Sequence, residues 1–341
     1  MLKIDAFPHI LPAKFYARMW DRSTGEAANM RKRVSGIPVL FDLDARFRVM
    51  EQFGDDYRQV LTVASPPIET LGPPEVAADL ARLANDELAE LCRRHPDRFA
   101  GFAASLPMND PDAAVGEAQR AVRELGALGV QVFTNVNGLP LDDPRFGPLF
   151  DAMAALDRPI WVHPARSSGH PDYLTEGRSK YELWWVFGWP YETAIFMSRL
   201  IFSGILDRHP RLRILTHHGG GMVPHFAGRI GPGLDQMGAR TPDEDLSGVA
   251  KRLARRPFDY YRMFYGDTAL FGAEHALRCA IEFFGVEHML FGSDMPFDPE
   301  RGPMFIRETI ANIEALDLSE GDRAAVYEGN ARRVLGVAPL P

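Results

Sequence analysis

The chain has 341 residues, of which 46% are hydrophobic and 25% are charged, with a net charge of -8 and a pI near 5.7. This composition is typical of a globular protein with a large core. The acidic balance argues against nucleic acid or an anionic membrane as a partner, because both favour a concentrated positive face on the protein.

Short β-rich runs alternate with amphipathic helical stretches from one end of the chain to the other. The helical patterns include residues 73–96, 110–129 and 191–210, and several open with Asp or Pro and close with Gly or His-Pro. Eight strands are predicted, at residues 2–7, 58–64, 98–105, 130–134, 159–163, 212–217, 261–266 and 288–292.

Eight strands that are each followed by a helix predict an α/β fold of the (β/α)8 TIM-barrel type. A doubly wound sheet also alternates strands and helices, but no glycine-rich phosphate turn follows the first strand. Long connections at 10–43 and 164–190 follow strands one and five, on the face where barrel enzymes carry their sites. Since no composition shift marks a boundary, residues 1–341 are expected to form one domain.

Histidine and aspartate gather just after the predicted strands, whose carboxyl ends meet at one mouth of a barrel. Neutral imidazoles and carboxylates are the ligands that zinc and similar divalent ions take. Each residue also has a plain structural role open to it, such as a turn or a helix cap. Of the adjacent pair after strand six, only one side chain is expected to be functional, because successive strand residues point to opposite faces. The residues concerned are His9, His163, His217, His218, Asp267 and Asp294.

Six sequence motifs resemble the amidohydrolase-related decarboxylases typified by aminocarboxymuconate semialdehyde decarboxylase. The family has Ile-Asp-x-His-x-His-x-x-Pro where this chain has "IDAFPHILP". The other matches are the stretch at 96–132, "PIWVHP", "HGGGMVPHFAGRI", "LFGSDMPF" and "EGNARRVLG". The likeness covers almost the whole chain, and it indicates the family but not a substrate.

The resemblance implies a role for several residues. His163 and Asp294 would be metal ligands, and His9 matches the second histidine of the strand-one pair. His218, directly before the glycines, would be the catalytic acid or base, with Asp294 also able to handle a proton. The resemblance adds two substrate-binding residues, Trp185 as an aromatic wall and Arg229 as an arginine that reaches the neighbouring subunit's site in family dimers. A second carboxylate-binding arginine would be Arg31, Arg33 or Arg46.

Phe7 departs from the family pattern, because it occupies the place of the first metal histidine and cannot ligate a metal. Three ligands, His9, His163 and Asp294, would remain, which is enough for a catalytic zinc-type site with water in the fourth position. The expected ion is zinc, with manganese as the second choice. His218 could instead close the ligand shell, at the expense of its freedom as a base. The other alternative is a metal-free site, in which Phe7 forms a hydrophobic wall against the substrate.

The function expected from the resemblance is metal-dependent, non-oxidative decarboxylation of a small aromatic or unsaturated carboxylic acid. The alternative is a hydrolase or hydratase that acts on a lactone, an amide or a C–C bond. A third possibility is a barrel that binds a ligand without turning it over. Tryptophans and Phe187 in the second long connection are expected to exclude water and pack a flat substrate.

The expected partners and location rest on the resemblance, on the absence of membrane or leader patterns and on the cysteine count. The resemblance implies a homodimer and a small carboxylate substrate. No charged-then-apolar leader and no run of 18 apolar residues is visible, so neither secretion nor membrane spanning is expected. The two cysteines, Cys92 and Cys279, are too few and too far apart to make a disulfide framework. Because such a chain suits a reducing compartment, a cytoplasmic location is predicted.

Overall fold

The computed structural model describes residues 1–21, 25–241, 245–246 and 248–338, without the side chains of 25–29. Eight parallel strands follow one another in chain order across one sheet. Each coincides with a predicted strand to within a few residues. They are β1 (Lys3–Asp5), β3 (Tyr57–Val63), β4 (Phe99–Ser105), β5 (Gly129–Phe133), β8 (Ile160–His163), β9 (Ile214–Thr216), β10 (Tyr265–Asp267) and β11 (Met289–Leu290).

Backbone hydrogen bonds link the last strand to the first and nearly close the sheet. The carbonyl oxygen of Phe291 accepts from Ala6 N at 2.8 Å, and that of Met295 accepts from His9 N at 2.8 Å. The short strand β2 (His9–Ile10) pairs with β3 and places His9 opposite Thr62. The (β/α)8 barrel predicted from the sequence is confirmed.

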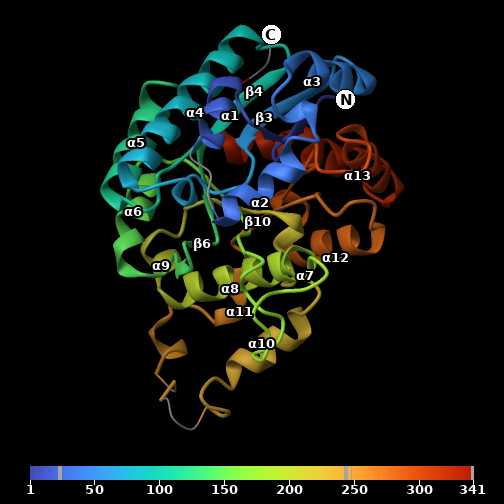
Figure 1. Cartoon of the computed structure of the whole chain (residues 1–341). Helices are drawn as coiled ribbons and strands as arrows, with labels where there is room; N and C mark the ends of the chain where they lie inside the picture. Colours follow the sequence, from blue (N-terminus) through green and yellow to red (C-terminus); the bar gives the residue numbers. More distant parts are fainter. Residues whose placement is uncertain (22–24, 242–244, 247, 339–341) are drawn as a thin grey trace.

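Helices surround the barrel, with α4, α5 and α6 along one side and α12 and α13 on the opposite side (Figure 1). None of the helices within the described ranges is long and apolar enough to cross a membrane. The bounds are α1 (Ala13–Trp20), α2 (Gly25–Val34), α3 (Leu43–Met50), α4 (Pro74–Arg94), α5 (Pro111–Arg123), α6 (Gly147–Ala155), α7 (Leu183–Val186), α8 (Gly188–Phe202), α9 (Ile205–Arg208), α10 (Ala227–Asp235), α11 (Pro257–Tyr261), α12 (Glu274–Phe284), α13 (Pro303–Ala315) and α14 (Glu320–Ala324).

Two predicted elements differ in detail from the structure. The helix expected at 191–210 is divided into α8 and α9, because Gly204 adopts a left-handed φ of 75° between them. The strand expected to start at residue 261 starts at Tyr265, because Pro257 opens the short helix α11 just before it.

The barrel interior is filled by apolar side chains, so only its mouth is left for chemistry. Trp161 is fully buried there, and its indole Nε1 donates to the carbonyl oxygen of Ala6 at 2.8 Å. Val334 and Leu335, from the C-terminal segment, belong to the same buried cluster as Ile4 of β1. The two long connections lie at the carboxyl ends of β1 and β8; residues 22–24 of the first fall outside the described ranges.

Candidate active site and metal centre

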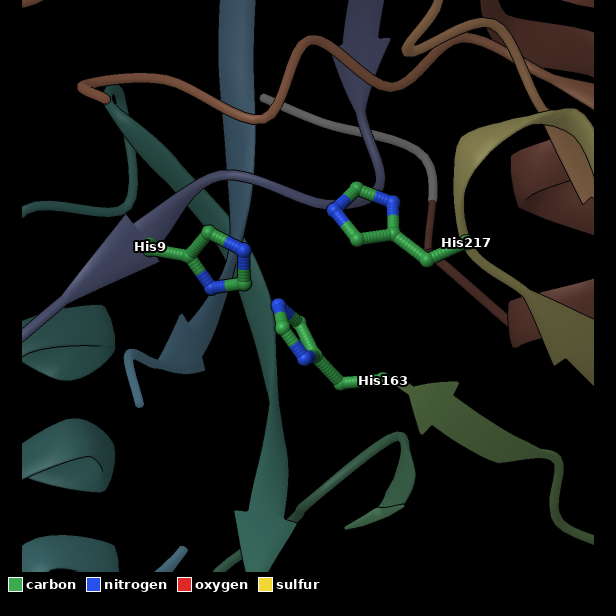
Figure 2. A group of neighbouring side chains, drawn as sticks. All are labelled: His9, His163 and His217. Carbon is green, nitrogen blue, oxygen red and sulfur yellow. The ribbon is translucent and has the colours of Figure 1, made fainter. Parts of the chain in front are cut away.

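Three buried histidines converge at the carboxyl ends of the barrel strands, with their rings turned toward one another (Figure 2). His9 lies in β2, His163 ends β8, and His217 directly follows β9. One ring nitrogen from each lies within 4.8 Å of the others. Asp294 joins the cluster, since its Oδ1 lies 3.0 Å from His9 Nε2 and 3.2 Å from His217 Nε2. The predicted ligands His9 and Asp294 thus lie side by side, and His163 joins them through the group that it forms with His9 and His217.

Hydrogen bonds fix which nitrogen of His9 and His163 is free. The Thr62 hydroxyl donates to the carbonyl oxygen of Pro8 at 2.8 Å, so it accepts from His9 Nδ1 at 2.9 Å. His163 Nδ1 lies 2.7 Å from the carbonyl oxygen of Pro164, which only accepts. Both histidines therefore carry the proton on Nδ1, and both keep an Nε2 lone pair for another partner.

His217 is held by a second aspartate. Its Nδ1 bonds to Asp267, whose other oxygen accepts from Gly219 N at 3.1 Å and Ala269 N at 3.2 Å. Burial opposes a charged imidazole here, but Asp267 and Asp294 outweigh it and raise the pKa of His217 to about 9. Asp267 therefore orients an imidazole and does not simply cap a helix.

The two adjacent histidines do not point to opposite faces, as the strand pattern predicts; that only one of them is functional stays a prediction. The rings of His217 and His218 are both buried and stack with centroids 3.9 Å apart. Strand β9 ends at Thr216 and His218 adopts a φ of 56°, so the alternation of a strand does not apply. Asp294 also has a positive φ, 61°. Such conformations cost about 1–3 kcal/mol each and are concentrated at functional sites.

Charge in the cluster suits a divalent cation. Burial disfavours an ionised Asp294, but the charge of His217 and hydrogen bonds from the histidines hold the pKa of this carboxyl well below its usual range. Burial lowers the pKa of His9, His163 and His218, so these imidazoles are neutral near pH 7. His9 Nε2 is buried, and Asp294 Oδ1 lies 3.0 Å from it without the alignment of a hydrogen bond. Neutral imidazoles beside a carboxylate fit zinc or manganese.

Phe7 packs behind this cluster. Its ring is fully buried and stacks on the His217 ring with centroids 3.9 Å apart and an interplanar angle of 14°. It is not among the described residues that line the cavity at the barrel mouth. Phe7 therefore lies behind the His217 ring and not on the cavity wall. The substrate-binding role predicted for Phe7 remains a prediction.

A cavity of about 1890 Å³ opens at the barrel mouth, with His163, His218 and Asp294 among its lining residues. Trp185 and Trp189 also line it. Trp189 is the closer of the two to the cluster, because its ring lies 5.2 Å from that of His163. The aromatic wall predicted around Trp185 thus includes Trp189, whereas Phe187 is exposed.

The structure separates the candidate arginines of the first long connection. Arg46 is fully buried and donates to the carbonyl oxygen of His9 at 2.8 Å, which makes it part of the scaffold. Arg31 is exposed. Arg33 lines the cavity, with its guanidinium 4.8 Å from the Phe297 ring. Arg33 is therefore the candidate for holding a substrate carboxylate.

Arg229 lies in α10 and is exposed. It is not among the described residues that line the cavity of its own chain. The position is compatible with the predicted role in a neighbouring subunit, which stays a prediction.

Glu69 is a buried carboxyl on the cavity wall that sequence reasoning missed. It is 4% exposed, and its Oε1 has no hydrogen-bond partner among the described residues. Burial raises the pKa of Glu69 from 4.5 to about 8. The sequence "PPIET" carries no signal of this burial, because the position follows from the turn after β3.

Glu69→Gln is expected to stabilise the protein at alkaline pH. The buried carboxyl is protonated at low pH, and its ionisation costs stability as the pH rises from about 4.5 through 8. At about 1.4 kcal/mol per pKa unit, the cost reaches up to about 5 kcal/mol at pH 9. The unfolding temperatures of the wild type and of Glu69→Gln, measured at pH 5 and at pH 9, show this loss of stability. The exposed variant Glu124→Gln is the control, and an equal effect of Glu69→Gln at both pH values would contradict the prediction.

Comparison with known proteins identifies relatives along nearly the whole chain. Residues 15–337 match the model of a family described as "Amidohydrolase". The chain is 30% identical to a 2-amino-3-carboxymuconate-6-semialdehyde decarboxylase of Dictyostelium discoideum, over 99% of this chain and 92% of that protein. It is 33% identical to a gamma-resorcylate decarboxylase of Rhodococcus jostii, over 86% and 87%. A 2-keto-4-carboxy-3-hexenedioate hydratase of a Sphingobium species is 27% identical, over 91% and 87%.

Solved structures of decarboxylases are similar to this one. A 2,6-dihydroxybenzoate decarboxylase in complex with 2,6-dihydroxybenzoate has a TM-score of 0.76 and 27% identity, over 98% of this chain and 99% of that chain. A dihydroxybenzoic acid decarboxylase from a Polaromonas species, with bound manganese and the inhibitor 2-nitroresorcinol, has a TM-score of 0.77 and 27% identity, over 98% and 97%.

Proposed function

The chain belongs to the amidohydrolase family, and from this premise we propose that it is a metal-dependent, non-oxidative decarboxylase of a small aromatic or unsaturated carboxylic acid. The observation that carries the proposal is the cluster of imidazoles beside ionised Asp294, which meets an aromatic-lined cavity at His163, His218 and Asp294. Relatives named as decarboxylases of gamma-resorcylate, which is 2,6-dihydroxybenzoate, support it.

We assign His9, His163 and Asp294 as the metal ligands. A divalent ion held there would act as a Lewis acid toward a substrate oxygen. Zinc is the first candidate, because imidazole nitrogen outnumbers carboxylate oxygen in the cluster. Manganese is the second, since a decarboxylase relative binds it.

His218 is the proposed proton carrier. Its Nε2 lies 3.5 Å from Asp294 Oδ2, and its Nδ1 is buried without a hydrogen-bond partner among the described residues. As a neutral base, His218 would take the proton of a substrate hydroxyl and return it to the carbon that bears the carboxylate. The C–C bond then breaks and its electron pair returns to the substrate, so that carbon dioxide leaves and a C–H bond replaces the carboxylate.

Binding would depend on side chains around the cavity. Arg33 would pair with the substrate carboxylate, while Trp185 and Trp189 would pack against the flat face of the substrate and exclude water. Arg229 would serve the partner's cavity in a homodimer. Exposed apolar side chains near α10, such as Phe226, support such a contact.

We also propose a cytoplasmic location, which the free thiols of Cys92 and Cys279 support. The residues matched by the family, 15–337, favour a single domain.

Release of carbon dioxide from relatives' substrates tests the function. The zinc- or manganese-loaded protein, incubated with 2,6-dihydroxybenzoate or 2-amino-3-carboxymuconate-6-semialdehyde, is expected to release carbon dioxide in step with loss of the acid. A chelator should stop the reaction. Addition of water or opening of a ring without release of carbon dioxide would favour a hydrolase or hydratase, and a hydratase from a Sphingobium species is among the relatives. Tight binding of the acids without any product would favour a barrel that only binds.

A further inference from the structure

We infer that His217 is a metal ligand, which takes the place of the ligand that Phe7 cannot provide. The inference rests on the proposed metal site and extends it to a residue that the sequence pattern left as a passenger. It predicts three imidazole ligands, from His9, His163 and His217, together with Asp294.

The geometry of the cluster supports the larger ligand set. Four ligand atoms placed about 2.1 Å from one ion lie roughly 3.4 Å from each other in a tetrahedral site. Asp294 Oδ1 is 3.0 Å from His9 Nε2 and 3.2 Å from His217 Nε2. One ring nitrogen from each of the three histidines lies within 4.8 Å of the others, and the rings approach from three separate segments of the chain (Figure 2). His217 therefore belongs both to the group with His9 and His163 and to the group with Asp294, whereas His163 belongs to the first of them.

The surroundings of His217 match those of a ligating imidazole. Histidine ligands commonly donate the nitrogen that does not bind metal to a carboxylate, which fixes the orientation of the ring. Asp267 provides that carboxylate to His217 Nδ1 and is itself held by two backbone amides. The Nε2 atom of His217 is then the one that faces Asp294, and a bound cation would replace the proton that this nitrogen shares with Asp294 in the metal-free protein.

Aromatic rings, including that of Phe7, hold the His217 imidazole in place. Its ring lies 3.9 Å from the His217 ring at an angle of 14°, and the His218 ring lies 3.9 Å away on the same imidazole. His217 is thus packed between two rings and can turn little about its Cβ. Position 7 contributes no ligand atom, but it positions the residue that does.

Metal titration of the full-length protein tests the inference. Protein stripped of metal should bind about one zinc per chain, and His217→Gln should weaken zinc affinity by about 100-fold or more. Phe7→His in the His217→Gln background should recover part of the loss, because position 7 lies against the same centre. His209→Gln is the matched control, since His209 bonds to Asp151 away from the cluster and its loss should leave affinity unchanged.

X-ray absorption of the zinc-loaded wild-type protein gives a readout that needs no variant. Three imidazole ligands are expected, and two would overturn the inference, as would zinc affinity of His217→Gln within about threefold of wild type. A wild-type protein that binds no zinc or manganese would also overturn it. Carbon dioxide release is measured separately. Decarboxylation by a protein with only two imidazole ligands would reject the role of His217 but not the proposed function. Three imidazole ligands without decarboxylation would reject the proposed function but not the role of His217.

Discussion

His163→Ala is expected to weaken metal binding by about 100-fold or more and to lower decarboxylase activity by about a thousandfold or more. His163 ends β8 with Nδ1 bonded to the Pro164 carbonyl oxygen, so Nε2 is the nitrogen left to bind a metal. A Lewis acid contributes several kcal/mol to a transition state, and each 1.4 kcal/mol is a factor of ten in rate.

Elemental analysis of the two purified proteins measures the first part of this prediction, and initial rates measure the second. The wild type should hold about one zinc or manganese per chain and the variant much less. His209→Ala serves as the control for loss of an imidazole elsewhere. A His163→Ala protein that keeps its metal would show that His163 is not a ligand.

His218→Asn is expected to lower kcat by about 10²–10⁴-fold, the usual contribution of a positioned acid or base. Metal content and KM should change little, because His218 is assigned to proton transfer and not to the ligand set. Asparagine keeps a polar side chain of similar reach at a position where φ is positive, and it tolerates that conformation better than most residues.

Single-turnover rates with bound substrate separate this loss from a slower product release. Asp294→Asn, which removes a ligand, should differ from His218→Asn by losing the metal as well. If kcat of His218→Asn stayed near the wild-type value, proton transfer would belong to another group.

The barrel could be predicted because the chain follows local rules. Short apolar runs mark β3 and β8, as in strands that are buried on both faces. Helix α5 begins where Asp110 caps it, with its side chain accepting from Ala113 N at 3.0 Å. Strand ends that carry His9, His163 and Asp294 could be located from the same pattern, since all parallel strands end at one mouth.

The rest depends on backbone geometry that no periodicity encodes. The alternation of a strand predicts that His217 and His218 point to opposite faces, yet β9 ends at Thr216, one residue before His217. A usable signal was Asp267 at the end of the neighbouring strand β10, which lies beside β9 in the sheet. The choice of Arg33 among the arginines, and the approach of Trp189 to His163, depend on how the long connections fold over the mouth.

Decarboxylation in heavy water tests the central claim most directly. Metal-loaded protein supplied with an acid that it consumes should yield a product that has lost carbon dioxide and carries one deuterium at the carbon that held the carboxylate. That result would show a C–C bond exchanged for a C–H bond with a solvent-derived proton. A product that keeps the carboxylate and gains the elements of water would contradict the account.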